Sequence, residues 1–193
     1  MRIDGPNIYL RYLEEEEVEG LQEAIRGFWP DGTMPTKREL YKFRYGVGVA
    51  NNSMFDRTEL TDSTDLHEAV YAIVLQDNSV VGYNVTMYEE RKFVSVMTAL
   101  LPDYRNYGYY REVVYLRHRL GFDVLKATQS NMKMPLDGES AIKTVLDALY
   151  DETLDTFKFQ NAIWRWGCLS EAHYRAYLEA NPEINSIPWE IDW

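Results

Sequence analysis

The sequence lacks the features that tie a protein to a membrane or to an oxidising compartment. Its 193 residues include one cysteine, Cys168, so an internal disulfide and a CxxC zinc site are both excluded. No apolar run reaches the roughly 18 residues of a transmembrane helix. The N-terminal segment becomes acidic and has no apolar core of the kind found in signal peptides. We therefore expect a cytoplasmic protein that does not contact membranes, with Cys168 as a small buried apolar residue.

Basic residues are in the minority. The chain has 20 Lys and Arg against 31 Asp and Glu, a formal charge of −11, which argues against a nucleic-acid binder. The 3 histidines are widely spaced and form no HExxH pair, so no metal cofactor is expected. Residues 68–133 carry 8 basic and 7 acidic side chains, whereas the segments on either side are strongly acidic. An anionic ligand is therefore repelled least by the middle third of the chain.

Hydrophobic patterning predicts one mixed α/β domain over residues 1–193. Hydrophobic residues make up 46% of the chain, which is enough for a packed core. Residues 28–67 show no strong periodicity, which is uncommon in a compact domain unless the segment is functional or contains short helices. The expected strands are residues 8–13, 70–75, 80–88, 92–101, 122–128 and 156–166, and the expected helices begin near residues 14, 109, 139 and 170.

Finer expectations concern two of these elements. The helix that begins near residue 109 is expected to stop at Gly121. In the last strand, Trp164 and Trp166 alternate with Arg165, so both indoles are expected to face the core. The expected buried stripe of the helix is Tyr109, Val113, Leu116 and Leu120, and its expected exposed side is Arg111, Glu112, Arg117, His118 and Arg119.

The segment from Leu100 to Val114 is the most informative part of the chain. A strand ends there, a short loop follows, and a helix begins, so unpaired backbone N–H groups meet the positive end of a helix. Gly108 lets the backbone approach a phosphate closely, and Arg105 and Arg111 add positive charge. The pattern favours a pyrophosphate site. An ordinary strand–loop–helix connection with a turn glycine would give the same pattern.

The order of elements resembles the GCN5-related N-acetyltransferase (GNAT) superfamily over most of the chain. The opening IYLRYLEEEEVEGLQEAI resembles that family's first strand and helix, and YAIVLQDNSVVGYNVTMYEERKFVSVMTALLP resembles its second to fourth strands. The family's acyl-CoA loop, Arg/Gln-x-x-Gly-x-Gly/Ala, is matched by Arg105 and Gly108. Tyr110 departs from it, because it stands where the family has a small residue. The next strand with Asn131 after it resembles the fifth strand and its asparagine.

The resemblance implies a fold and a donor site, and it makes residues 28–67 either a substrate-side lid or a variable insertion. The fold is a mixed α/β (α+β), largely antiparallel central sheet flanked by helices, with the fourth and fifth strands splayed apart. Acetyl-CoA is the implied donor, with its pantetheine arm in the gap between those strands. The residues implied to bind it are Ala99, Leu100, Leu101, Arg105, Asn106, Tyr107, Gly108, Tyr109, Tyr110 and Asn131.

The implied reaction is acyl transfer to a primary amine by direct attack on the thioester. The ammonium must lose a proton first, and Glu89 and Glu90 are the best-placed base candidates, although a solvated hairpin turn explains them more simply. The family's tyrosine is absent at its usual offset, which leaves Tyr150 as a distant candidate for the acid on the leaving thiolate. The acidic flanks favour a cationic acceptor, small or protein-borne, and a homodimer is possible. A catalytically inactive CoA-binding or protein-interaction module is the alternative, and an acidic decoy for a nucleic-acid-handling protein is a third hypothesis.

Overall fold

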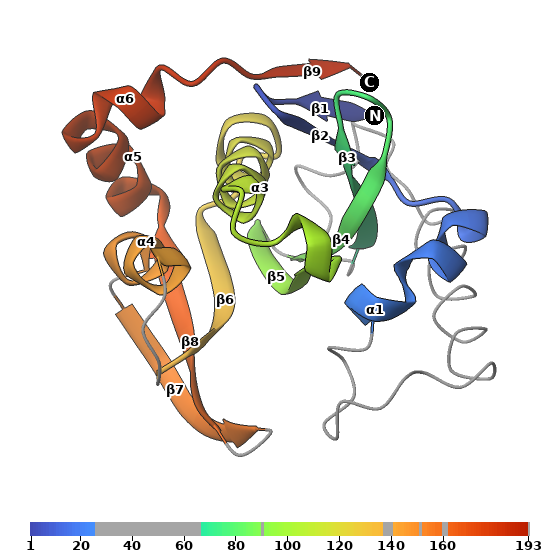
Figure 1. The fold of residues 1–193 in the computed structure, drawn as a ribbon. Coiled ribbons are helices and arrows are strands. Elements are labelled where there is room, and N and C mark those ends of the chain that lie inside the picture. The colour runs from blue at the N-terminus through green and yellow to red at the C-terminus, as the bar shows by residue number, and fades with distance from the viewer. Residues whose placement is uncertain (26–66, 90, 137–140, 151, 160–161, 193) are drawn as a thin grey trace.

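The computed structural model describes residues 1–25, 67–89, 91–136, 141–150, 152–159 and 162–192, which form one sheet with helices on both faces (Figure 1). The strands are β1 (Arg2–Asp4), β2 (Ile8–Tyr12), β3 (His67–Leu75), β4 (Val80–Glu89), β5 (Lys92–Leu100), β6 (Gln129–Pro135), β7 (Glu152–Phe159), β8 (Ala162–Ser170) and β9 (Glu190–Asp192). The helices are η1 (Glu15–Leu21), α1 (Gln22–Ile25), η3 (Pro102–Tyr104), α3 (Tyr109–His118), η4 (Arg119–Val124), α4 (Ala141–Leu149), α5 (Glu171–Ala180) and α6 (Pro182–Asn185).

The sheet is almost entirely antiparallel, as expected. Its strand order is β7-β8-β6-β5-β4-β3-β2-β1-β9. Among the described strands, only β5 and β6 pair in parallel. That pairing runs from Lys92–Gln129 to Ser95–Met132 and goes no further. Beyond Ser95 the two strands diverge, so the predicted splay between the fourth and fifth strands of the family order is confirmed.

Both faces of the sheet are buried at its central strands. Neighbouring residues of β3 contribute to opposite cores, with Ile73 packed on the α3 side and Val74 on the side of η1. In the helical segment expected near residue 14, Val18 and Leu21 are buried in the second core. This segment begins as a 3₁₀ turn rather than an α-helix. The long apolar run of β3 therefore reflects a strand covered on both sides.

The expected strand over residues 122–128 is wrong. The helix does not stop at Gly121, because α3 continues as the π-helical turn η4 to Val124, and the next strand begins only at Gln129. Gly121 serves close packing instead of termination, since a Cβ at this position would lie 3.0 Å from the Phe93 ring.

The expected exposed side of α3 is also wrong for its C-terminal half. Arg117, His118 and Arg119 are all buried. The reason is that α3 lies between the sheet on one side and α4, α5 and α6 on the other (Figure 1). A helix covered on both sides buries polar residues too, and these must find partners inside the protein.

The C-terminal arm of the sheet differs from its prediction in two ways. The expected strand 156–166 is two antiparallel strands, β7 and β8. On β8 the buried side chain is Arg165, which donates to the Tyr150 carbonyl at 2.9 Å, whereas Trp164 and Trp166 are half-buried. The predicted burial of Cys168 on the same strand is confirmed.

The last elements follow their prediction. The helix expected from Ser170 is α5, with the Ser170 hydroxyl accepting from the backbone N–H of His173 at 3.1 Å. The tail packs on the rest of the molecule, because β9 pairs with β1. None of the described helices has the length and hydropathy needed to cross a membrane.

Gly82 of β4 packs tightly against the backbone of β5. A Cβ at Gly82 would overlap the carbonyl oxygen of Ala99 and lie 2.9 Å from Leu100 Cδ2. We predict that Gly82→Ala lowers the free energy of unfolding by about 1–3 kcal/mol, because the backbone of β5 must move. Gly20→Ala is the control, since nothing lies within 4 Å of a Cβ there. Urea unfolding of both variants measures the difference, and equal stability would contradict the prediction.

Candidate functional site

The loop between β5 and α3 presents backbone N–H groups at a helix N-terminus. Gly108 is the N-cap residue of α3 and no side chain caps it. Its φ of 86° and the φ of 68° at Asn106 are left-handed, and both residues are exposed. A Cβ at Gly108 would meet nothing within 4 Å, so its left-handed conformation is what favours glycine. Left-handed residues beside a helix N-terminus form a concave anion site.

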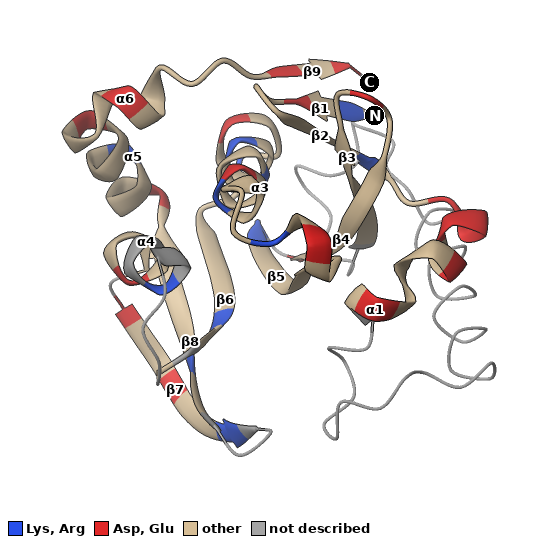
Figure 2. Ribbon diagram, viewed as in Figure 1, with Lys and Arg blue, Asp and Glu red and all other residues tan. Residues whose placement is uncertain are grey.

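Two arginines lie at this loop. The Arg105 Nε donates to the Leu100 carbonyl at 3.1 Å, so the side chain returns to the end of β5, and Arg111 is exposed in the first turn of α3. Tyr107 and Tyr109 stack with ring centroids 5.8 Å apart. Figure 2 shows both blue and red segments in α3 and just before it, while η1, α1, α6 and β9 carry red segments. The predicted loop residues therefore lie together at one end of the gap, where basic and acidic side chains are mixed.

The gap itself begins where β5 bulges. Thr86 of β4 is opposite Ser95, but Val85 is opposite Met97, so Val96 is an additional residue on β5. The Leu101 N–H donates to the Val81 carbonyl at 2.8 Å. Because strand backbone groups alternate in direction, the groups of Leu100 face the gap instead of β4.

Tyr110 and Asn131, two of the predicted donor-binding residues, lie in α3 and β6. The Tyr110 ring is half-buried against the core, and burial raises the pKa of its hydroxyl, opposed by the positive charge of Arg117. Asn131 was expected to follow a strand, but it lies within β6, opposite Val94. Its side-chain oxygen accepts a hydrogen bond from Gln129 Nε2 at 2.7 Å. Asn131 therefore lies one residue before the strands diverge.

Tyr150 belongs to a polar cluster inside the core. Its side chain is fully buried, and its hydroxyl lies 2.7 Å from His118 Nε2 and 2.9 Å from Ser130 Oγ. The Nδ1 of His118 is 2.5 Å from the Val114 carbonyl, which can only accept. Nδ1 therefore carries the hydrogen, and Nε2 accepts a hydrogen bond from the Tyr150 hydroxyl.

Burial controls the protonation of this cluster. It lowers the pKa of His118 well below its ordinary value, and the neighbouring charge of Arg117 lowers it further. Burial also raises the pKa of Tyr150, with Arg117 opposing the shift. Both groups are therefore neutral near pH 7, and Arg117 is the charged member of the cluster.

Two buried polar atoms beside the gap have no hydrogen-bond partner within the described residues. One is Asn84 Oδ1, whose amide nitrogen donates to Thr98 Oγ1 at 2.7 Å. The other is Nε of Arg117, a side chain that hydrogen bonds Ser95. Ser95 and Thr98 lie on β5 on either side of the bulge. Unpaired buried donors and acceptors are costly, so their presence here indicates a place for ligand groups.

Glu89, one of the two base candidates, lies away from this gap. Glu89 is exposed and lies opposite Lys92 of β5. Lys92 precedes Ser95 by three residues, which is about 10 Å along β5. Glu90 lies outside the described residues, as does the candidate lid except for the first residue of β3. Among the described residues, no group of three His, Cys, Asp or Glu side chains is placed to hold a metal ion.

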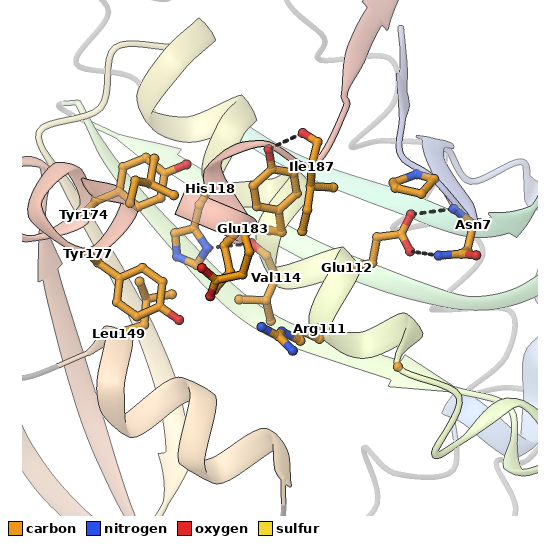
Figure 3. A pocket seen from close by; sticks show the side chains of 15 residues that line it. Asn7, Arg111, Glu112, Val114, His118, Leu149, Tyr174, Tyr177, Glu183 and Ile187 are labelled. Atoms are coloured by element: carbon orange, nitrogen blue, oxygen red, sulfur yellow. Dashed lines mark hydrogen bonds between the residues drawn. The ribbon is translucent and has the colours of Figure 1, made fainter. Parts of the chain in front are cut away.

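A cavity of about 360 Å³ adjoins the same loop on the outer side of α3. Figure 3 shows Arg111 at one edge, Glu183 near the centre, and Glu112 turned to Asn7, whose side-chain amide donates to it at 2.9 Å. The walls are mostly apolar and aromatic, a lining that suits a planar apolar ring with an anionic group at Arg111. They come from Pro6, Asn7, Gly108, Arg111, Glu112, Val114, Tyr115, His118, Leu149, Tyr174, Tyr177, Leu178, Glu183, Ile184 and Ile187.

The sequence analysis missed Arg117 and Asn84. For Arg117 a signal was present: it follows Val113 by four residues, so helical spacing places it on the buried stripe. The prediction placed Arg117 on the exposed side of the helix because the residue is charged. Asn84 gave no such signal, because an asparagine in a strand next to a bulge is recognised only when the partner strand is known.

The neutral, buried His118 predicts a pH dependence of stability. Its folded pKa lies below the unfolded value of about 6.5, so the contribution is complete above that pH and is lost as the pH falls. We predict that wild-type unfolding free energy falls by up to about 1.4 kcal/mol per pH unit between pH 6.5 and 5 relative to His118→Gln. Urea unfolding at several pH values measures both slopes. Parallel slopes would contradict the prediction.

No protein-family profile and no curated protein matches the sequence. Solved structures do match it. Apo FdhC, described as a nucleotide-linked sugar GNAT, superposes with a TM-score of 0.68 at 14% identity, over 95% of this chain and 98% of that chain. A GNAT-family acetyltransferase from Bacillus anthracis gives 0.60 at 16% identity, over 89% and 99% of the two chains. Mutant forms of the spermidine/spermine N-acetyltransferase SpeG from Vibrio cholerae give 0.62 at 11%, over 88% and 97%. Together with the splayed sheet, these likenesses establish that the chain has the fold of the GCN5-related N-acetyltransferases, as a divergent example in sequence.

Proposed function

We propose that the protein is an acyl-CoA-dependent N-acyltransferase that transfers an acyl group to a primary amine. One observation carries the proposal. β5 leaves β6 after Ser95, and the chain then forms a loop with left-handed Gly108 at the N-terminus of α3. A gap that ends at an anion site suits a long ligand with phosphates at one end.

The donor is proposed to lie along β5. The loop from Arg105 to Tyr110 holds the pyrophosphate, and the pantetheine arm follows the backbone of residues 99–101 towards Asn131. The inward position of Tyr110 supports this, because its ring packs on the core rather than standing over the loop. The cavity beside Arg111 offers apolar and aromatic walls for the adenosine end. Acetyl-CoA is the simplest donor that fits this placement.

The acceptor is proposed to be a cationic amine. The acidic residues of η1 and α1 lie on the face of the sheet opposite α3, so an amine approaching from there meets negative charge (Figure 2). SpeG, one of the similar structures, is named for spermidine and spermine. A role for Glu89 or Glu90 as base and for Tyr150 as acid stays a prediction, as do a homodimer and a cytoplasmic location.

The first test of the function is calorimetric titration with CoA and acetyl-CoA. We predict saturable binding at one site, and a loss of at least about tenfold in affinity for the double variant Arg105→Ala, Gly108→Glu, because the first change removes a positive charge at the pyrophosphate and the second adds a negative one. An amine screen with acetyl-CoA then measures turnover. Binding without turnover of any amine would favour the inactive module instead.

A matched control is the double variant Arg2→Ala, Gly20→Glu. It makes the same residue changes and the same change in net charge, but Arg2 and Gly20 lie in β1 and η1, away from the loop. Its CoA affinity is expected to equal that of the wild type. No binding by the wild type at millimolar CoA would overturn the proposed function.

A further inference from the structure

Arg117 is a buried cation without an acidic partner. Its side chain is 1% exposed, and no carboxylate of the described residues forms an ion pair with it. Among the described residues the other two buried arginines differ: Arg119 pairs with Asp123 at 2.9 Å and Arg165 with Asp147 at 3.0 Å. Burying a charge without a counter-charge is costly, so a chain that keeps one has a use for it.

The groups around Arg117 satisfy it poorly. Nη1 hydrogen bonds the Ser95 hydroxyl, and Nη2 contacts only the Met132 sulfur at 3.2 Å and the Tyr150 hydroxyl at 3.4 Å. Nε has no partner in the described part of the chain. A guanidinium has five N–H donors arranged to match a carboxylate, and sulfur is a weak acceptor. Tyr150 does not supply the negative charge, since burial raises the pKa of its hydroxyl.

The position of Arg117 relates it to the gap. Ser95 and Met132, which its two terminal nitrogens contact, face each other in the last rung that joins β5 to β6. The guanidinium therefore spans both strands at the closed end of the gap. From Ser95 to Leu100 the strand rises about 17 Å over five residues, a length comparable with an extended pantetheine arm.

A donor held by its phosphates at residues 105–110 has its acyl end farthest from that loop. The acyl end is therefore the part of the ligand nearest to Ser95 and Arg117. We infer that Arg117 selects an acyl donor whose acyl group ends in a carboxylate, which supplies the missing partner of the guanidinium. The inference rests on the proposed function and replaces acetyl-CoA by a dicarboxylic half-thioester of CoA.

A carboxylated acyl group does not change the chemistry of the transfer. The amine, after losing one proton, attacks the thioester carbon, the C–N bond forms, and the C–S bond breaks. The electron pair of that bond leaves with sulfur, which takes up a proton to give free CoA. The terminal carboxylate is unchanged throughout, so Arg117 acts in binding and selection and is not asked to move a proton.

The test compares two stable CoA thioethers of equal chain length, S-butyl-CoA and S-(3-carboxypropyl)-CoA, by calorimetric titration. We expect the carboxylated compound to bind at least about tenfold more tightly, although the protein carries a net charge of −11 that opposes a further negative charge. In Arg117→Met, which has a similar chain length and no charge, the preference disappears while the affinity for CoA itself changes little.

Arg119→Met is the control, because it removes another buried arginine from the same helical segment and is expected to keep the preference. Circular dichroism establishes whether each variant folds. If Arg117→Met does not fold, the comparison of the two thioethers on the wild type still decides the inference. Equal binding of the two thioethers by the wild type, or a preference that survives Arg117→Met, overturns it. Failure of the wild type to bind CoA itself overturns the proposed function and this inference together.

Discussion

The early end of the pairing between β5 and β6 is the constraint on which the rest of the structure depends. The two strands share only the rungs from Lys92–Gln129 to Ser95–Met132. Parallel strands require a crossover, and here α3 and η4 supply it. The crossover begins at the loop after β5 and ends at Gln129. It therefore determines the positions of the loop and of the α3 N-terminus, and with them the width of the gap.

The crossover helix is covered on both sides, which explains the polar groups in the core. Tyr150, His118 and Ser130 come from three different elements and satisfy one another within 3.4 Å. A cluster of this kind fixes how α3 sits on β6, since any shift leaves buried hydrogen-bonding groups unpaired. Arg117 is the member that the cluster does not satisfy.

The sequence predicted local structure well and burial on α3 poorly. The meander over β3 to β5 follows from alternation and its turns, and α5 follows from the Ser170 cap, because both signals are local. Gly121 lies against the Phe93 ring of another strand, and Arg117 is buried against Ser95 of β5 and Met132 of β6, so both depend on residues distant in the sequence. The loop residues 105–110 were found because a phosphate site is built from consecutive residues. The partners of Asn84 and Tyr150 are distant in the sequence, so no local pattern reveals them.

The last described strand of the chain lies beside the first. β9 pairs with β1 from Arg2–Asp192 to Asp4–Glu190, so N and C lie together at one edge of the sheet (Figure 1). During synthesis β1 leaves the ribosome early, and its outer edge stays open until residues 190–192 follow. Closing a contact between the two ends of a chain is slow, and an open strand edge pairs readily with other chains. A truncation before β9 therefore leaves the outer edge of β1 unpaired and prone to aggregation.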